Sequence, residues 1–496
     1  MKRISLLQVT AMAIAVAAGL FAATSFADVR LTKAFTDNAV LQRDVPVKVW
    51  GYADAGEDVT VKFNGQEVKT KAGENGKWMV ELQAMPARND GSDLVVTGKN
   101  EIVLKNVVVG EVWICSGQSN MEMPLSSWYQ KLPNGCGRLA CNTEEITGDF
   151  SFIRFNRVHH DTAMSEKEDF NSYGWLECKN AVQKDCTAAG FHFAMRLHKE
   201  LGCPIGLIDS NWGGSNINSW IPDEGWNNCE ETVEPGKQLI EARNKAGKSD
   251  FRTAGGMYYA MLAPWKNYAV RGAIWYQGCS NAGEGGFYYY KQKAMILEWR
   301  KIWGDIPFYW VQLANFMGTS EDPNCDGGWA RIRDGQTRCL EVPKTGQAVI
   351  IDAGEATDIH PQNKWIVGNR LALNALAQVY GKNYQYASPT FKEAKFEDGK
   401  ATLKFDNVGG GLMIAKLFGR EVKQAPDVNT IKWFAIAGED GKYAWADAQI
   451  VDKDTVVLTS PAVPNPVKAR YAWQNNPDGV TLYSKEGLPV TPFTTE

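Results

Sequence analysis

The chain has 496 residues, with 53 basic and 57 acidic side chains and a formal net charge of −4 at pH 7. Single hydrophobic cores stop growing near ~250–300 residues, so we expect more than one domain. A weakly acidic chain without a basic tract argues against nucleic acid and anionic lipid as partners.

The first 27 residues have the features of a secretory signal. Met1-Lys2-Arg3 is followed by an apolar stretch from Val9 to Ala23 and by the small-residue site Ser25-Phe26-Ala27. A membrane anchor is the alternative, but the stretch is shorter than the ~20 residues of a span, and no basic cluster follows it. We interpret 1–27 as a signal peptide and expect a secreted or periplasmic protein that begins at Asp28 and has no membrane segment.

Residues 28–108 form short runs of alternating apolar and polar residues. Turn signals such as Asn64-Gly65, Asn75-Gly76 and Asp90-Gly91 separate these runs. The pattern predicts a small N-terminal antiparallel β-sandwich.

Residues 109–390 alternate buried strands with helical stretches. The runs EVWIC, PIGLID, GAIWY and FYWVQL are separated by stretches such as GFHFAMRLHKELG. This α/β pattern predicts a parallel sheet. Residues 221–256 and 318–340 are interpreted as long loops.

From 391 to 496 the chain returns to β character. This pattern predicts a second, C-terminal β-sandwich.

Three hydrophobic runs end in the same kind of turn. They lead into Gly117-Gln118-Ser119-Asn120, Gly213-Gly214-Ser215-Asn216 and Gly278-Cys279-Ser280-Asn281. If these runs are neighbouring parallel strands, their carboxyl ends share one sheet edge, where open α/β sheets gather ligand-binding groups. With Asp358-Ile359-His360-Pro361 as a fourth segment, they indicate a serine hydrolase site.

A hydrolytic serine needs a base, and the chain has five histidines. His192 and His198 lie on a predicted helix, where we expect packing roles. His159 and His160 follow a strand-like run and have no acidic partner in a tight motif. His360 lies in a loop with Asp358 two residues before it, and is our candidate base.

Ser119 is the candidate nucleophile because it follows a buried run and is expected to open a helix. Its Oγ would then stand at the sheet edge, with backbone N–H groups facing a developing oxyanion. The alternative is that Ser119 only caps the helix. The Gly-x-Ser-x-Gly elbow is absent from the sequence, which disfavours the α/β-hydrolase family.

All ten cysteines follow the predicted cleavage site, so disulfides are the default expectation for an exported chain. The close pairs are Cys136 with Cys141, Cys178 with Cys186, and Cys325 with Cys339. No paired Cys-x-x-Cys pattern occurs, so we predict no metal site.

Four blocks, VVVGEVWICSGQSNMEMPL, IGLIDSNWGGSNINSWIP, IWYQGCSNA and TDIHPQNKWIVGNRLA, closely resemble the sialate O-acetylesterase family of SGNH-type hydrolases. The resemblance extends over nearly the whole mature chain. It implies a flavodoxin-like SGNH hydrolase core at 109–390 with β-rich flanking domains. It also implies removal of acetyl esters from O-acetylated carbohydrates, without metal or cofactor. Relatives with this layout also deacetylate plant polysaccharides such as xylan.

The resemblance assigns roles to individual residues. Ser119 matches the nucleophile, His360 the general base and Asp358 the orienting acid. The backbone N–H groups of Ser119 and Gly214 and the amide of Gln277 match the oxyanion hole. Gly213 is nearly as good a choice as Gly214, and the alternative for Gln277 is a buried amide that ties loops together.

The sequence departs from the family pattern at two positions. Cys279 stands where the third block usually has Glu, and one hypothesis pairs it with Cys115 in a disulfide. Asp358 lies two residues before His360, whereas the wider superfamily often has its acid three before. Glu355 and Asp352 are therefore kept as substitutes.

Two groups of residues are candidates for substrate recognition. Trp212 and Tyr276, with Trp128 and Trp220, flank the motifs and are candidates to bind a sugar. Arg154, Arg157 and Arg333 are candidates for a sialate carboxylate. Sialic acid and plant polysaccharide stay equal alternatives, and the oligomeric state is not predicted.

The rival function from another class is a non-catalytic carbohydrate-binding protein, which is motivated by Cys279. A peptidase or lipase is disfavoured, since no long apolar acyl-binding segment is evident.

Overall fold

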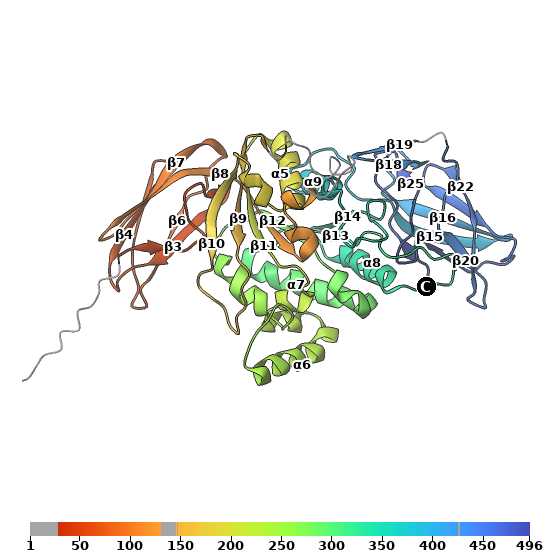
Figure 1. The fold of residues 1–496 in the computed structure, drawn as a ribbon, viewed down its shortest axis with the longest axis horizontal. Coiled ribbons are helices and arrows are strands. Elements are labelled where there is room, and N and C mark those ends of the chain that lie inside the picture. Colours follow the sequence, from red (N-terminus) through yellow and green to blue (C-terminus); the bar gives the residue numbers. More distant parts are fainter. Residues whose placement is uncertain (1–27, 130–144, 146, 425–426) are drawn as a thin grey trace, which may run out of the picture.

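The structure, a computed structural model, describes residues 28–129, 145, 147–424 and 427–496. The predicted signal 1–27 and the cysteines Cys136 and Cys141 lie outside the described residues. Three regions follow one another along the long axis of the molecule (Figure 1): an N-terminal β region, a central region with helices on both sides of a sheet, and a C-terminal β region.

The central sheet contains the three predicted runs as neighbours. Its strands lie in the order β10-β9-β11-β8-β12-β13-β14, and β10 alone in this series is antiparallel to its neighbour. Counted along the chain, β8, β11, β12, β13 and β14 have the spatial order 2-1-3-4-5, which is the order of flavodoxin-type sheets. The bounds are β8 Glu101–Gly117, β9 Phe150–Val158, β10 Ser172–Cys178, β11 Ile205–Asn211, β12 Gly272–Tyr276, β13 Phe308–Gln312 and β14 Thr345–Val349.

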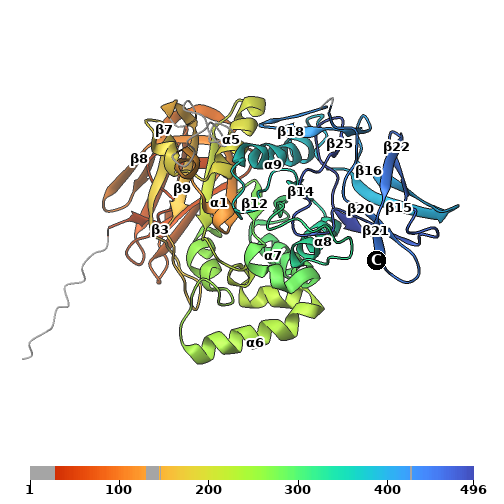
Figure 2. The ribbon, with the colours of Figure 1, turned by 45° about the vertical axis from the view of Figure 1, so that its right-hand side comes forward.

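Helices cover both faces of this sheet (Figures 1 and 2). Helix α5 packs on α9 on one side, and α7 contacts α8 on the other. The helices are α1 Ser119–Glu122, α2 Ser126–Tyr129, α5 Ala188–Leu201, α6 Glu230–Ala246, α7 Tyr288–Trp303, α8 Gly328–Arg338 and α9 Lys364–Gln378.

Two segments predicted as loops contain helices, α6 within 221–256 and α8 within 318–340. Helix α6 is polar and buries few residues, so it has no apolar stripe for a sequence pattern to reveal. Its acidic first turn and its C-cap glycine, Gly247, stabilise its ends instead. Its buried cation Arg243 pairs with Asp223 at 2.7 Å.

The N-terminal region is made of two sheets, and one of them continues into the central region. Strands β1, β3 and β6 form a separate sheet, whereas β2 and β7 pair directly with β8. The predicted boundary between 108 and 109 therefore falls inside β8. The N-terminal strands are β1 Arg30–Leu31, β2 Val40–Gln42, β3 Val47–Tyr52, β4 Asp58–Phe63, β5 Gln66–Lys71, β6 Lys77–Leu82 and β7 Arg88–Thr97.

The C-terminal region has the predicted β character and its own apolar core. Two four-stranded sheets, β15-β16-β23-β22 and β21-β20-β24-β26, are accompanied by the ribbons β17-β25 and β18-β19. The strands are β15 Thr390–Glu397, β16 Lys400–Asp406, β17 Leu412–Ile414, β18 Lys416–Phe418, β19 Glu421–Lys423, β20 Phe434–Ala437, β21 Tyr443–Trp445, β22 Asp447–Asp452, β23 Thr455–Thr459, β24 Lys468–Tyr471, β25 Leu482–Ser484 and β26 Phe493–Thr494.

The expected disulfides are not formed within the described part of the chain, where all eight cysteines are free. Cys115 lies under α5, since a Cβ added to Gly190 would come within 3.1 Å of its sulfur. Cys279 instead interacts with Asn120 and Lys364, so the proposed Cys115–Cys279 pair is wrong. Cys325 and Cys339 face different carbonyls, those of Trp473 and Tyr289. Cys178 and Cys186 are in side-chain contact as thiols.

No helix of the described residues has the length and apolar character needed to cross a membrane, and no group of His, Cys, Asp and Glu among those residues is placed to hold a metal ion.

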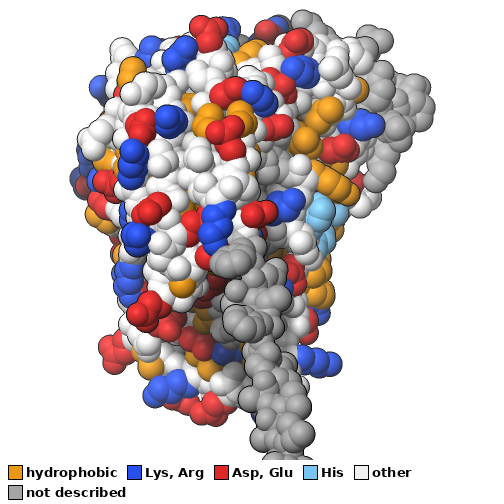
Figure 3. All heavy atoms as spheres, turned by 90° about the vertical axis from the view of Figure 1, so that its left-hand side faces the viewer, with side chains coloured by type: hydrophobic (Ala, Val, Ile, Leu, Met, Phe, Trp, Pro, Cys, Tyr) orange, Lys and Arg blue, Asp and Glu red, His pale blue; other side chains and the backbone are white. Residues whose placement is uncertain are grey.

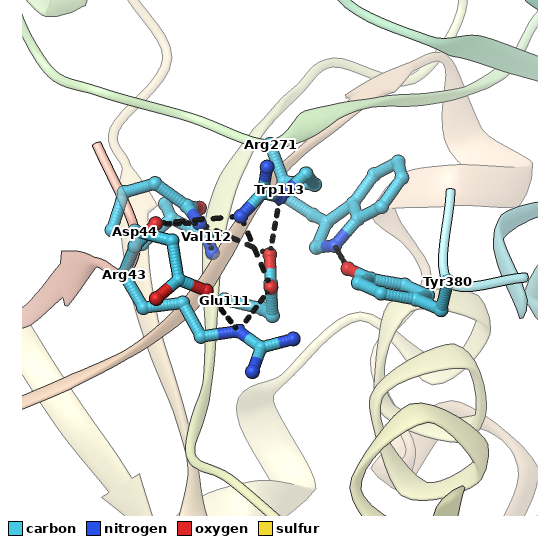
Figure 4. Close-up of polar contacts among 8 residues, drawn as sticks. Arg43, Asp44, Glu111, Val112, Trp113, Arg271 and Tyr380 are labelled. Atoms are coloured by element: carbon cyan, nitrogen blue, oxygen red, sulfur yellow. Dashed lines mark hydrogen bonds and ion pairs between the residues drawn. The ribbon is translucent and has the colours of Figure 1, made fainter. Parts of the chain in front are cut away.

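A buried carboxylate joins the N-terminal region to the base of the central sheet (Figure 4). Glu111 of β8 is fully buried and accepts hydrogen bonds from Arg43 at 2.5 Å, from Arg271 at 2.8 Å and from Gln42 at 3.1 Å. The two arginines come from different regions of the chain and reach it from two sides. Losing this carboxylate would leave two cations without their shared partner.

We therefore predict that Glu111→Ala lowers the free energy of unfolding by about 3–5 kcal/mol, the usual cost of breaking a buried ion pair. Chemical denaturation monitored by far-UV circular dichroism measures it. Asp58→Asn is the control, because it removes the exposed pair with Lys71 and should change stability by less than about 0.5 kcal/mol. Equal effects of the two substitutions would contradict the prediction.

Candidate active site

Ser119 stands at the carboxyl end of β8, in a turn that needs glycine. Gly117 has φ +139°, and a Cβ on it would lie 2.2 Å from the carbonyl oxygen of Tyr276 on β12. Ser119 is the first residue of α1, and Gln118 is the N-cap. The capping alternative for Ser119 is therefore not supported, and its partly exposed hydroxyl is available for other contacts.

The structure brings Ser119, His360 and Asp358 together. The Nε2 of His360 lies 3.0 Å from the Oγ of Ser119, although the two residues are 241 positions apart. Asp358 Oδ1 lies 3.2 Å from Nδ1 of the same ring and accepts the backbone N–H of His360 at 2.9 Å. A two-residue spacing is therefore sufficient, because the Asp358 side chain folds back over its own turn.

The two substitute acids have other partners. Asp352 is paired with Arg370 at 2.6 Å, and Glu355 accepts from the backbone and side-chain amides of Gln362. Burial raises the pKa of the Glu355 carboxyl, and the nearby Asp358 adds to the rise. Asp358 is thus the acid that contacts His360.

His192 and His198 contact groups away from the site, whereas His160 contacts the helix that carries Ser119. The Nδ1 of His198 donates to Cys203 O at 2.8 Å and the ring stacks on Phe152, and buried His192 lies 4.0 Å from Glu145. His160 pairs with Glu122 of α1 at 2.7 Å, and Glu122 lies one turn after Ser119.

Backbone N–H groups surround Ser119 on the side of β11. A Cβ on Gly213 would be 3.4 Å from the Cβ of Ser119. The Gly213 N–H donates to Glu122. Among the described residues, the Gly214 N–H makes no turn or loop hydrogen bond to a backbone carbonyl, and the Ser119 N–H opens α1, where it has no acceptor within the helix. Gly214 has φ +75°, which glycine adopts readily. The geometry thus favours Gly214 over Gly213 as an oxyanion donor.

Gln277 does not offer its amide to this site. The side chain is fully buried, and its Nε2 donates to Ser215 O at 3.2 Å and to Asn281 Oδ1 at 2.6 Å. Its Oε1 accepts from Tyr288 at 2.7 Å. Because both N–H groups already have acceptors, the prediction of Gln277 as an oxyanion donor is replaced by the alternative, an amide that ties loops together.

The aromatic rings predicted to bind a sugar are buried or stacked on other rings. Tyr276 and Trp220 are buried at 1 % and 0 % exposure. Trp212 borders the site, but His160 stacks on it at 4.3 Å and Phe251 at 5.6 Å, with interplanar angles of 5° and 22°. Trp212 therefore already packs against two other rings. The side chain of Trp128 lies outside the described part of the chain.

Two of the three candidate arginines are excluded by their burial. Arg333 is fully buried and donates to the carbonyl oxygens of Leu313, Ala314, Gln474 and Asn475. Burial lowers its pKa to about 9. Arg154 is buried with Glu177 and the carbonyl of Asn106. Arg157 alone of the three lies beside the site, where it donates to Glu122 O at 2.9 Å.

Glu122 connects these groups and was not predicted as a site residue, although its place three residues after Ser119 puts both on one helical turn. Its carboxylate accepts the Gly213 N–H with one oxygen and meets His160 with the other. Burial opposes its ionisation, but the bonds from His160 and Gly213 outweigh it and lower the pKa of the Glu122 carboxyl. Glu122 thereby holds the Gly213–Gly214 turn against Ser119.

A serine, an imidazole and a carboxylate in this order, beside free backbone N–H groups, have the geometry of a serine hydrolase site. Comparisons with known proteins agree with this class. Residues 109–376 match the family described as carbohydrate esterase, sialic acid-specific acetylesterase, and the chain belongs to this family. It is thus related to carboxylic ester hydrolases.

Similar proteins cover nearly the whole chain. A solved carbohydrate acetylesterase from Xanthomonas citri is 35 % identical, with 94 % of this chain and 99 % of that chain covered and a TM-score of 0.81. The sialate O-acetylesterases of Rattus norvegicus and Homo sapiens are each 26 % identical, over 93 % and 94 % of this chain and 93 % and 92 % of their own lengths.

We predict that Glu122→Ala lowers kcat for p-nitrophenyl acetate by about 10- to 100-fold with little change in KM. The expected loss is smaller than the loss of a whole oxyanion donor, because the turn is loosened and not removed. Glu122→Gln keeps an acceptor for Gly213 and should stay within about threefold of wild type. Glu393→Ala, which removes an exposed carboxylate paired with Lys404, is the control. Wild-type kcat in Glu122→Ala would refute the role of Glu122.

Proposed function

We propose that this protein is a serine carbohydrate O-acetylesterase that releases acetate from O-acetylated sugars. The observation that carries the proposal is the contact of Ser119 Oγ with His360 Nε2 at 3.0 Å, backed by Asp358. Family membership supplies the acyl and substrate class. The assignment of the core to the SGNH type rests on the same family and on the order of the parallel strands.

In the proposed reaction, Ser119 loses its proton to His360 and attacks the acetyl carbonyl carbon. The N–H groups of Ser119 and Gly214 stabilise the oxyanion, and His360 then protonates the departing sugar hydroxyl. Water, deprotonated by His360, hydrolyses the acetyl-enzyme and releases acetate. Asp358 accepts the Nδ1–H of His360 and so keeps Nε2 free to accept the serine proton.

For the substrate, we propose a neutral acetylated sugar of a polysaccharide rather than a sialic acid. Arg154 and Arg333 are buried with other partners, so neither is free for a sialate carboxylate. The third candidate, Arg157, already donates to the backbone carbonyls of Asp185 and Glu122. A non-catalytic binding protein is not favoured, because the serine, base and acid are all present and in contact.

The test is acetate release from acetylated xylan and from O-acetylated sialosides. Release that falls by about 10⁴–10⁶-fold in Ser119→Ala would support the esterase, and the better substrate would decide the sugar class. Asp358→Asn should lose about 10⁴-fold, whereas Glu355→Gln should stay near wild type. A fully active Ser119→Ala would refute the proposal.

We further propose that the protein is exported and begins at Asp28 after removal of residues 1–27. The charged start, apolar stretch and small-residue site support this. Mass spectrometry of the protein recovered from periplasmic and culture fractions should give a chain starting at Asp28. An intact Met1 in a cytoplasmic fraction would contradict it.

A further inference from the structure

The carbonyl groups on both sides of His360 are held by two buried side chains. Asn120 Nδ2 donates to Ile359 O at 3.0 Å, and Lys364 Nζ donates to Pro361 O at 2.5 Å. The two side chains are joined to each other, because Lys364 Nζ also donates to Asn120 Oδ1 at 2.7 Å. Both are fully buried. Ile359 and Pro361 are the chain neighbours of His360, so hydrogen bonds fix the backbone on both sides of the histidine.

The two side chains come from elements that carry the reacting groups. Asn120 follows Ser119 in α1, and Lys364 is the first residue of α9, immediately after the His360 loop. The side chain of Asn363 caps α9 by accepting the Ile366 N–H at 3.2 Å, which fixes the position of Lys364. The bonds among Asn120, Lys364, Ile359 and Pro361 therefore connect the serine end of the site directly to the histidine end.

The surroundings of Lys364 suit a donor that does not depend on a full charge. Burial lowers the pKa of Lys364 to about 7, against the opposing effect of Asp358, Cys279 and Glu355. The ring of Tyr276 lies 5.9 Å from its Nζ. A neutral amine still has two N–H groups, which is the number that the bonds to Asn120 and Pro361 require. The connection can thus persist on both sides of neutral pH.

Cys279 also interacts with the two side chains of this connection. The Cys279 thiol interacts with Asn120, Lys364 and Arg333. The thiol stays neutral near pH 7, because burial raises its pKa to about 12. This chain therefore holds its histidine loop through amide and amine hydrogen bonds without an anion at residue 279.

We propose that Lys364 and Asn120 are positioning residues that hold His360 Nε2 against Ser119 Oγ. They act through the His360 loop and do not touch the substrate. The inference rests on the proposed function only in requiring that Ser119 and His360 act together. A shift of about 1 Å in a reacting group can reduce a rate by about 100-fold, so loosening this loop is expected to be costly.

The test compares Lys364→Met, Asn120→Ala and the double variant, with Arg243→Met as a matched buried-cation control on α6. The readout is the rate of inactivation by diisopropyl fluorophosphate. In that reaction Ser119 Oγ bonds to phosphorus, fluoride leaves and His360 takes the serine proton. The reaction needs no sugar, so it tests the serine–histidine geometry even if the proposed substrate is wrong. Values of kcat and KM for acetate release are measured in parallel.

Each single variant should react about 100-fold more slowly than wild type, with kcat reduced and KM nearly unchanged. The double variant should lose no more than the worse single variant, since both changes break one connection. Arg243→Met should lower the melting temperature but keep the wild-type inactivation rate. A purely structural role for Lys364 would give the same pattern as Arg243→Met.

Wild-type inactivation rates in folded Lys364→Met would overturn the inference, as would full additivity in the double variant. If Lys364→Met does not fold, Asn120→Ala decides, because it removes the other end of the connection with a smaller change. Wild-type protein that resists the reagent also overturns the inference. Rapid inactivation of wild type without acetate release from either sugar substrate refutes the proposed function and leaves the inference standing.

Discussion

The whole arrangement depends on one strand, β8, because it belongs to two regions at once. Its first half pairs with β7 and β2 of the N-terminal region, and its second half lies between β11 and β12 in the central sheet. Glu111 lies where the first half of β8 meets the second half, and its carboxylate pairs with two arginines there. Ser119 follows the far end of the same strand. The nucleophile candidate is therefore placed by a rigid ladder of hydrogen bonds and not by a flexible loop.

Much of the fold and the main contacts of the candidate site could be predicted from the sequence. Buried runs that end in Gly-x-Ser-Asn turns were expected to be neighbouring strands, and β8, β11 and β12 are neighbours. The pairing of Ser119 with His360 was expected because few histidines were available and one lay beside an acid. Such inferences succeed where local composition alone decides the structure, as at strand ends and tight turns.

The errors share a physical origin, which is that sequence patterns do not show which hydrogen bonds a polar group has already made. Gln277 looked like a donor, yet its amide is fully used by Ser215 and Asn281. Arg333 looked like a free cation, yet four backbone carbonyls surround it. Trp212 looked like an open ring, yet His160 and Phe251 both stack against it. These are tertiary properties, and only packing reveals them.

The burial of Arg333 also bears on how such a chain can evolve. Its guanidinium binds carbonyls after β13 and carbonyls of the C-terminal region, and the β18–β19 hairpin reaches Asn363 at the start of α9. Removing the C-terminal region would strand a buried cation and expose the cap of the helix that follows the histidine loop. An exchange of the C-terminal region for an unrelated one would therefore have to supply new acceptors for Arg333 and a new contact for Asn363.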